Sequence, residues 1–84
     1  DAYEDRIKQA QDLIEERCGH RPAAEPEYSE VLTRSDIDAL IIATSWEHHV
    51  PAAIQAMRAG IPEGIEVGGV YSLEDCWELV RTYE

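Results

Sequence analysis

The stretch that decides the fold reads Ile37-Asp38-Ala39-Leu40-Ile41-Ile42-Ala43-Thr44-Ser45-Trp46-Glu47-His48-His49. Its uncharged apolar run, from Ala39 to Ala43, is typical of a parallel strand that is buried on both faces. The run stops at two small hydroxyl residues, Thr44 and Ser45, and a helical pattern follows. Open α/β sheets bind their ligands where a strand ends and the next helix begins. We therefore expect a ligand-facing turn at this point.

The residues after the turn predict a helix and a second strand. The helix ends at Gly60, and its apolar face consists of Val50, Ala53, Ile54 and Met57. Pro51 has no amide hydrogen, so we expect it in the first turn of this helix. Residues 61–67 predict the second strand, which is broken by Gly68-Gly69.

A last helix is predicted from Ser72 onward. Ser72 is expected as its N-cap, with Asp75 at the third position. Its apolar side chains recur at helical spacing and predict a buried face made of Leu73, Cys76, Trp77 and Val80.

The residues before the central strand predict two helices and one weak strand. Residues 1–18 show an amphipathic helical rhythm that ends at Gly19, and Asp1 with Glu4 resembles a capping box. Residues 20–27 contain two prolines, so any strand there is short and at an edge of the sheet. Residues 27–35 predict a short helix with Tyr28, Val31 and Leu32 turned inward.

The alternation of strands with helices predicts an α/β fold. Parallel βαβ units follow from strands that alternate with helices of about ten residues. Two clear apolar strand patterns and one short edge strand make an incomplete sheet of two to three strands with flanking helices. We therefore expect residues 1–84 to form a single partial domain of a larger doubly wound fold.

Composition narrows the class of partner. The 84 residues carry a formal net charge of −11, which argues against binding to nucleic acid or to an anionic membrane. No apolar run reaches the roughly 18 residues of a membrane span. Cys18 and Cys76 show no metal-ligand spacing, and we expect buried reduced thiols and a cytoplasmic location, with a single disulfide as the alternative.

From Ile37 onward the sequence resembles the Gfo/Idh/MocA family of nicotinamide-dinucleotide-dependent oxidoreductases. The family pattern D-A-V-x-I-A-T-P-N-x-x-H corresponds to residues 38–49 here, and its A-x-x-A-G helix end corresponds to Ala56–Gly60. The family's strand end E-K-P corresponds to Glu66-Val67-Gly68. The resemblance covers about 47 residues and implies a Rossmann-like parallel sheet that binds NAD or NADP.

The resemblance also implies that the chain is a fragment. A Gly-rich G-x-G-x-x-G turn, which seats the pyrophosphate, is absent from this sequence. The first strand of the family's dinucleotide domain and the substrate domain have no counterpart either. Asp1 corresponds to the acidic residue that holds the adenosine ribose, although an N-cap role explains it equally well. We expect the chain alone to be inactive.

Five positions are candidates for cofactor binding beside Asp1. The resemblance places the turn Thr44, Ser45 and Trp46 beside the ribose and pyrophosphate, His49 near the nicotinamide, and Glu66 at the nicotinamide ribose. The alternatives are structural: Thr44 and Ser45 cap a helix, His49 is a partly buried helix-start residue, and Glu66 is a solvated carboxylate. A metal site at Glu47-His48-His49 is disfavoured because consecutive helical residues point in different directions.

Val67 stands where family dehydrogenases carry a lysine that polarises or deprotonates the substrate hydroxyl. Valine can do neither. The family also includes NAD-using glycosidases, in which transient hydride transfer drives elimination. Three functions therefore remain open for the parent protein: an oxidoreductase acting on sugars or polyols, an NAD-dependent glycosidase or eliminating enzyme, and a non-catalytic domain that forms homo-oligomers through an open sheet edge.

Overall fold

The computed structural model describes residues 1–84, which separate into two compact units, Asp1–Val31 and Leu32–Glu84. None of the helices is both long enough and apolar enough to cross a membrane.

The first unit is dominated by α1, Glu4–Cys18, which ends at Gly19 in the left-handed conformation as the sequence predicts. Its N-cap residue is Tyr3, and no side chain caps the helix. The predicted capping box of Asp1 and Glu4 is therefore wrong. The Asp1 carboxylate instead accepts a hydrogen bond from the Tyr3 amide at 3.0 Å, outside the helix.

Polar contacts hold the segment after α1 against the helix. Arg21 pairs with Asp12 at 2.6 Å and with Glu15 at 2.9 Å, and Gln11 donates to the Pro22 carbonyl at 2.8 Å. No strand forms over residues 20–27, so the predicted edge strand is wrong. Pro22 and Pro26 lack amide donors, and the ladder of a sheet cannot form through them.

The short helix α2 spans Tyr28–Leu32 and contains no fully buried residue. The sequence predicts this helix a few residues too long, and its expected inward-facing residues are only partly covered.

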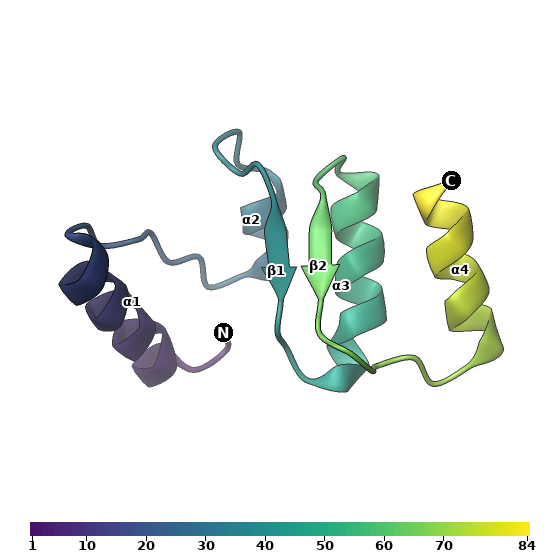
Figure 1. Ribbon diagram of the computed structural model, residues 1–84, viewed down its shortest axis with the longest axis horizontal. Coiled ribbons are helices and arrows are strands. Elements are labelled where there is room, and N and C mark those ends of the chain that lie inside the picture. Colours follow the sequence, from purple (N-terminus) through teal and green to yellow (C-terminus); the bar gives the residue numbers. More distant parts are fainter. The chain divides into compact units, whose positions relative to one another are not determined.

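The second unit is a βαβ unit followed by a helix (Figure 1). Strands β1, Leu40–Ile42, and β2, Glu63–Ile65, are parallel, with Ile42 paired to Ile65. Helix α3, Trp46–Arg58, connects the strands and packs on both of them, and α4, Leu73–Tyr83, packs on α3. A parallel open sheet with flanking helices confirms the predicted partial Rossmann-like α/β fold.

The core lies between α3 and one face of the sheet. Its buried apolar side chains are Ile42, Val50, Ala52, Ala53, Ile54, Ala56 and Ile61. Ala53 and Ala56 are fully buried, and their small size allows a close approach between helix and strands.

The opposite face of the sheet is not covered within this unit. Ile41 points away from α3 and is 79% exposed, beside Gly64 on the neighbouring strand. The prediction of a strand buried on both faces is therefore wrong. Its apolar run fits a covered strand, but within this unit a helix covers only one face of the sheet.

Pro51 lies one turn further into α3 than predicted, because the helix already begins at Trp46. Its missing amide leaves the Glu47 carbonyl without the usual intrahelical donor. The sequence pattern places the helix correctly but not its first residue.

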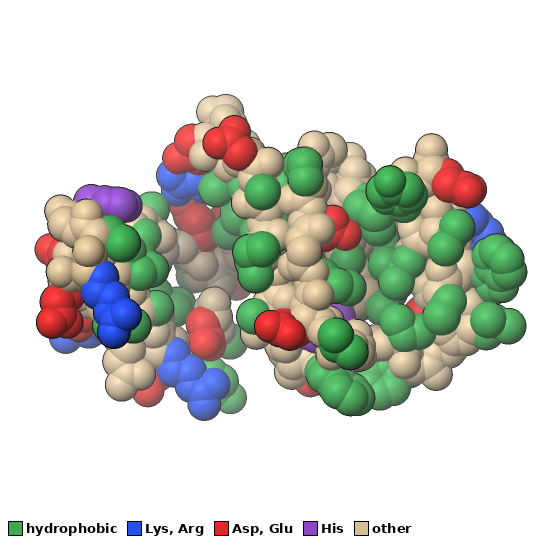
Figure 2. Space-filling model, viewed as in Figure 1, with side chains coloured by type: hydrophobic (Ala, Val, Ile, Leu, Met, Phe, Trp, Pro, Cys, Tyr) green, Lys and Arg blue, Asp and Glu red, His purple; other side chains and the backbone are tan.

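Helix α4 begins at the predicted residue, but the apolar face that the sequence predicts to be buried is exposed. The Ser72 hydroxyl accepts from the Asp75 amide at 3.1 Å, which confirms the N-cap. The predicted buried stripe is wrong: Leu73 is 73% exposed and Trp77 51%. Apolar side chains accordingly gather on the surface over α4 (Figure 2). Both cysteines are free thiols, and both are exposed, contrary to the prediction of buried thiols.

Candidate functional site

The predicted ligand-facing turn follows β1 directly. Thr44 and Ser45 are exposed, and Ser45 is the N-cap residue of α3. The Ser45 carbonyl accepts from the His48 amide at 3.0 Å, while its hydroxyl makes no cap bond to a backbone amide. The Thr44 hydroxyl lies 3.3 Å from the Ser45 carbonyl. Two hydroxyl groups are thus presented at the carboxyl end of β1.

A carboxylate occupies the N-terminus of α3. The Glu47 side chain accepts from its own backbone amide and, more weakly, from the Ser45 hydroxyl, and these bonds lower the pKa of the Glu47 carboxyl. A negative charge is favourable at a helix N-terminus, where amides lack intrahelical partners. This end of the helix therefore already holds an anionic group.

His49 is buried beneath the turn, with 1% of its surface exposed. Its Nε2 lies 3.0 Å from the Thr44 carbonyl oxygen, and its Nδ1 lies 3.2 Å from the Gly68 carbonyl oxygen. Thr44 follows β1 and Gly68 follows β2. The imidazole therefore connects the backbone segments at which the two strands end.

Gly68 and Gly69 pack flat against the first turn of α3. Both have positive φ, +104° and +86°. A Cβ on Gly68 would lie 2.6 Å from Cε2 of Trp46, and a Cβ on Gly69 would lie 2.6 Å from the Trp46 carbonyl oxygen. Glycine is required here for space as well as for backbone conformation. This close approach accounts for glycine at the position where the resembled family carries proline.

The end of β2 presents Glu66 and Val67 to solvent. The Glu66 amide donates to the Ile42 carbonyl at 3.2 Å, which keeps this residue in register beside the end of β1. Its carboxylate is exposed, and the Val67 side chain is 90% exposed. The two strand ends thus carry the Thr44 and Ser45 hydroxyls, the half-exposed Trp46 indole and the Glu66 carboxylate.

Two features of this region are missing from the sequence prediction. The Glu47 carboxylate at the helix start could have been anticipated from its place in the first turn. The Gly-Gly pair marks a close backbone approach, although the sequence does not say to which residues. Asp1, the remaining predicted site residue, belongs to the first unit, where it binds the Tyr3 amide.

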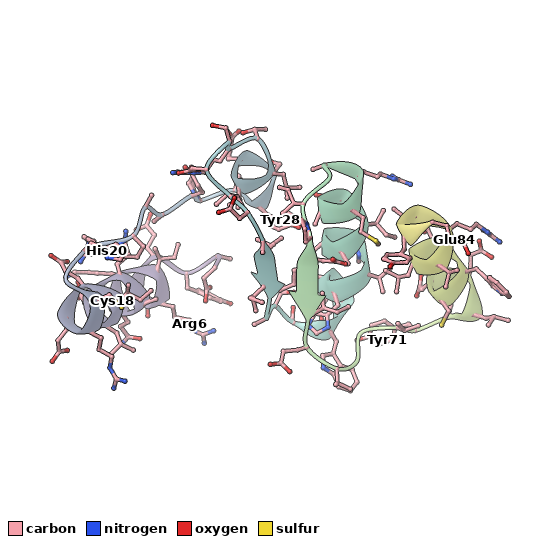
Figure 3. All side chains as sticks on the ribbon, turned by 45° about the horizontal axis from the view of Figure 1, so that its top comes forward. Arg6, Cys18, His20, Tyr28, Tyr71 and Glu84 are labelled. Atoms are coloured by element: carbon pink, nitrogen blue, oxygen red, sulfur yellow. The ribbon has the colours of Figure 1, made fainter.

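A separate groove of about 350 Å³ lies between α3 and α4. Tyr71, in the loop after β2 (Figure 3), lines the groove together with Asp75. Arg58 and Glu78 also line it and form an ion pair with an N–O distance of 3.6 Å. The Asp75 carboxylate accepts a hydrogen bond from the Tyr71 amide at 3.2 Å. No group of three or more His, Cys, Asp or Glu side chains is arranged to hold a metal ion.

Comparison with known proteins gives one consistent group of relatives. An alpha-N-acetylgalactosaminidase of Tannerella forsythia is 44% identical over 61 residues, which is 71% of this chain and 13% of the relative. A glycosyl hydrolase family 109 protein of Parabacteroides distasonis matches equally well over 61 residues. One of Shewanella baltica is 35% identical over an 88-residue alignment that takes in the whole chain and 19% of the relative.

The chain therefore spans between an eighth and a fifth of the length of these curated relatives. No protein-family model matches it. Over the aligned segment, this chain is a homologue of proteins named glycosyl hydrolase family 109.

Proposed function

We propose that the chain forms one side of the dinucleotide crevice of an NAD-dependent enzyme. The carrying observation is that Thr44, Ser45 and Glu66 lie at the carboxyl ends of two paired parallel strands. Ligands of open α/β sheets bind at this edge. Exposed hydroxyls and a carboxylate suit the ribose of NAD or NADP, whose hydroxyl groups both donate and accept hydrogen bonds.

The charges at α3 decide which part of the dinucleotide fits. Because the Glu47 carboxylate already occupies the helix N-terminus, a pyrophosphate there would meet a like charge. The ribose and the nicotinamide carry no negative charge and fit beside this turn, with the Trp46 indole available for stacking. When bound, the nicotinamide ring accepts and returns a hydride. The residues of this chain orient the nucleoside and carry no proton in this proposal.

We further propose that the parent enzyme cleaves glycosides. Val67, 90% exposed at the end of β2, has no group that can take a proton from a substrate hydroxyl. A lysine at this position supports net oxidation in the resembled dehydrogenases. The homology to an alpha-N-acetylgalactosaminidase and to glycosyl hydrolase family 109 proteins points in the same direction. The substrate class is a glycoside such as an N-acetylgalactosaminide.

The test uses the protein that carries this chain, incubated with NAD and a nitrophenyl α-N-acetylgalactosaminide. We expect nitrophenol release without accumulation of NADH, because a hydride that is returned leaves no net reduction. Accumulating NADH with a free sugar or polyol, and no glycoside cleavage, would identify a sugar oxidoreductase instead. A Val67→Lys variant should not gain glycosidase activity, since elimination does not need the lysine.

Self-association is a second candidate function, favoured by the uncovered sheet. β1 pairs with β2 only, and Ile41 beside its open edge is 79% exposed. A strand with one unpaired edge and an apolar face is a template for pairing with a second copy of the chain. Sedimentation of the chain and of Ile41→Lys over a range of concentrations tests this. Monomeric behaviour of the unsubstituted chain at every concentration excludes it.

A further inference from the structure

His49 is a buried histidine on α3. A histidine that bonds a ligand needs a ring nitrogen that faces the ligand. Both ring nitrogens of His49 instead face backbone carbonyls, at 3.0 Å from Thr44 and 3.2 Å from Gly68, and the ring is 1% exposed. Its surroundings thus separate it from the neighbouring His48, which is exposed on the same helix.

The two carbonyls belong to the two segments that form the crevice. Thr44 is followed by Ser45 and Trp46, and Gly68 is preceded by Glu66 and Val67. Between the strands, the backbone ladder ends with the bond from the Glu66 amide to the Ile42 carbonyl. Beyond that bond, the two exit segments are linked by the contacts of His49 and by the packing of Gly68 and Gly69 on the first turn of α3.

We propose that His49 is a positioning residue, which fixes the separation of the Thr44–Trp46 turn and the Glu66–Gly68 segment through their carbonyls. The proposal rests on the proposed function in that these segments hold the nucleoside. A carbonyl only accepts, so a neutral imidazole, which has one N–H, donates a hydrogen bond to one of the two carbonyls and lies in polar contact with the other. Loss of the ring nitrogens therefore frees both segments, while the fold of α3 and the sheet keeps its apolar core.

Three substitutions separate the two contacts. His49→Phe keeps a ring of similar size and removes both ring nitrogens. His49→Asn places an amide donor near the position of Nδ1 and can retain only the bond to Gly68. His49→Gln extends the donor toward the position of Nε2 and can retain only the bond to Thr44. His48→Phe is the matched control, because its side chain is exposed on the same helix.

The first measurement is amide hydrogen exchange by NMR on the full chain. For His49→Phe we expect faster exchange, about fivefold or more for each bond lost, at residues 45–46 and 69–70. The Leu40 and Glu66 amides, which are bonded within the sheet, should change much less. His49→Asn should loosen mainly the first segment, and His49→Gln mainly the second. The proposal is overturned if amide exchange accelerates uniformly in all three variants, or if it accelerates in none of them. If His49→Phe does not fold, His49→Asn and His49→Gln still decide the outcome.

The second measurement is NADH binding to the protein that carries this chain, followed by the fluorescence of NADH. We expect His49→Phe to weaken binding about tenfold, with His49→Asn and His49→Gln between it and the unsubstituted protein, and His48→Phe unchanged. Unchanged NADH affinity in variants with loosened segments overturns the positioning role. If the unsubstituted protein that carries this chain binds no NADH, that result contradicts the proposed function instead, and hydrogen exchange then decides the positioning role alone.

Discussion

Gly68 lies so close to Trp46 that a Cβ atom added to the glycine would stand 2.6 Å from Cε2 of the indole. The neighbouring Gly69 is confined more tightly, since its Cβ would meet the Trp46 carbonyl oxygen and the His49 Cβ, both at 2.6 Å. An exposed indole can turn aside, whereas a helical carbonyl cannot. The two glycines therefore differ in how much a methyl group disturbs them.

We expect Gly69→Ala to destabilise the fold by more than about 2 kcal/mol and Gly68→Ala by about 1 to 2 kcal/mol. Gly60→Ala is the matched control, because Gly60 also has a positive φ, +73°, but open space around it. It isolates the conformational cost from the steric cost. Urea denaturation followed by circular dichroism measures all three, and equal losses for Gly60 and Gly69 would refute the steric argument.

The ion pair of Asp12 and Arg21 gives a pH-dependent prediction. The hydrogen bond from Arg21 lowers the pKa of the Asp12 carboxyl below its ordinary 3.8. A lowered folded-state pKa means that the stabilising contribution is present above the unfolded pKa and is lost as pH falls through the folded value. Both groups are exposed, so the effect on stability is small.

Replacing Arg21 with Gln should raise the pKa of Asp12 toward 3.8, as measured by NMR titration of the carboxyl carbon. Asp36 serves as the internal control, because a hydrogen bond from Arg34 lowers the pKa of its carboxyl. Its titration should not move in the Arg21 variant. An unchanged Asp12 midpoint would show that the pair does not persist in solution.

The N-cap of α4 predicts a measurable loss of stability on truncation. Ser72→Ala removes the acceptor of the Asp75 amide and should destabilise the fold by about 1 kcal/mol. Ser45→Ala is the comparison, because Ser45 also stands at an N-cap but makes no side-chain cap bond. Its effect on thermal unfolding should be smaller, and the reverse order would argue against the described cap.

Two valines on adjacent helices test the orientation of α4 with the same substitution. Val50 is 5% exposed and Val80 is 46% exposed. We expect Val50→Ala to lower the free energy of unfolding by about 2 kcal/mol, because it removes buried methyl groups, and Val80→Ala by about 0.5 kcal/mol or less. Equal losses in urea denaturation would mean that the stripe on α4 is buried in solution.

Periodicity predicts the βαβ unit well because helices and strands impose different spacings on apolar residues. The apolar face of α3, with Val50, Ala53 and Ile54, is buried as that spacing requires. The same reasoning fails on α4, where Leu73 and Trp77 are exposed. An apolar stripe shows that one face of a helix favours burial. It does not show that another segment of this chain packs against that face.

The candidate site was predictable in position but not in geometry. A strand that ends at Thr44 and Ser45 before a helix indicates the ligand-facing turn. The two carbonyl contacts of His49 depend on backbone positions 5 and 19 residues away, and no local pattern encodes them. The segment 20–27 was wrongly predicted because strand propensity cannot compensate for two missing amide donors.

The two fully buried alanines of α3 restrict which substitutions this part of the protein can accept. Ala53 and Ala56, both 0% exposed, set the spacing between helix and sheet, and α3 also carries His49. A larger residue at either alanine would push the helix outward and move the imidazole away from its carbonyls. Exposed positions such as Val67 can therefore change without moving the backbone, whereas these two methyl groups fix the position of the helix that carries the imidazole.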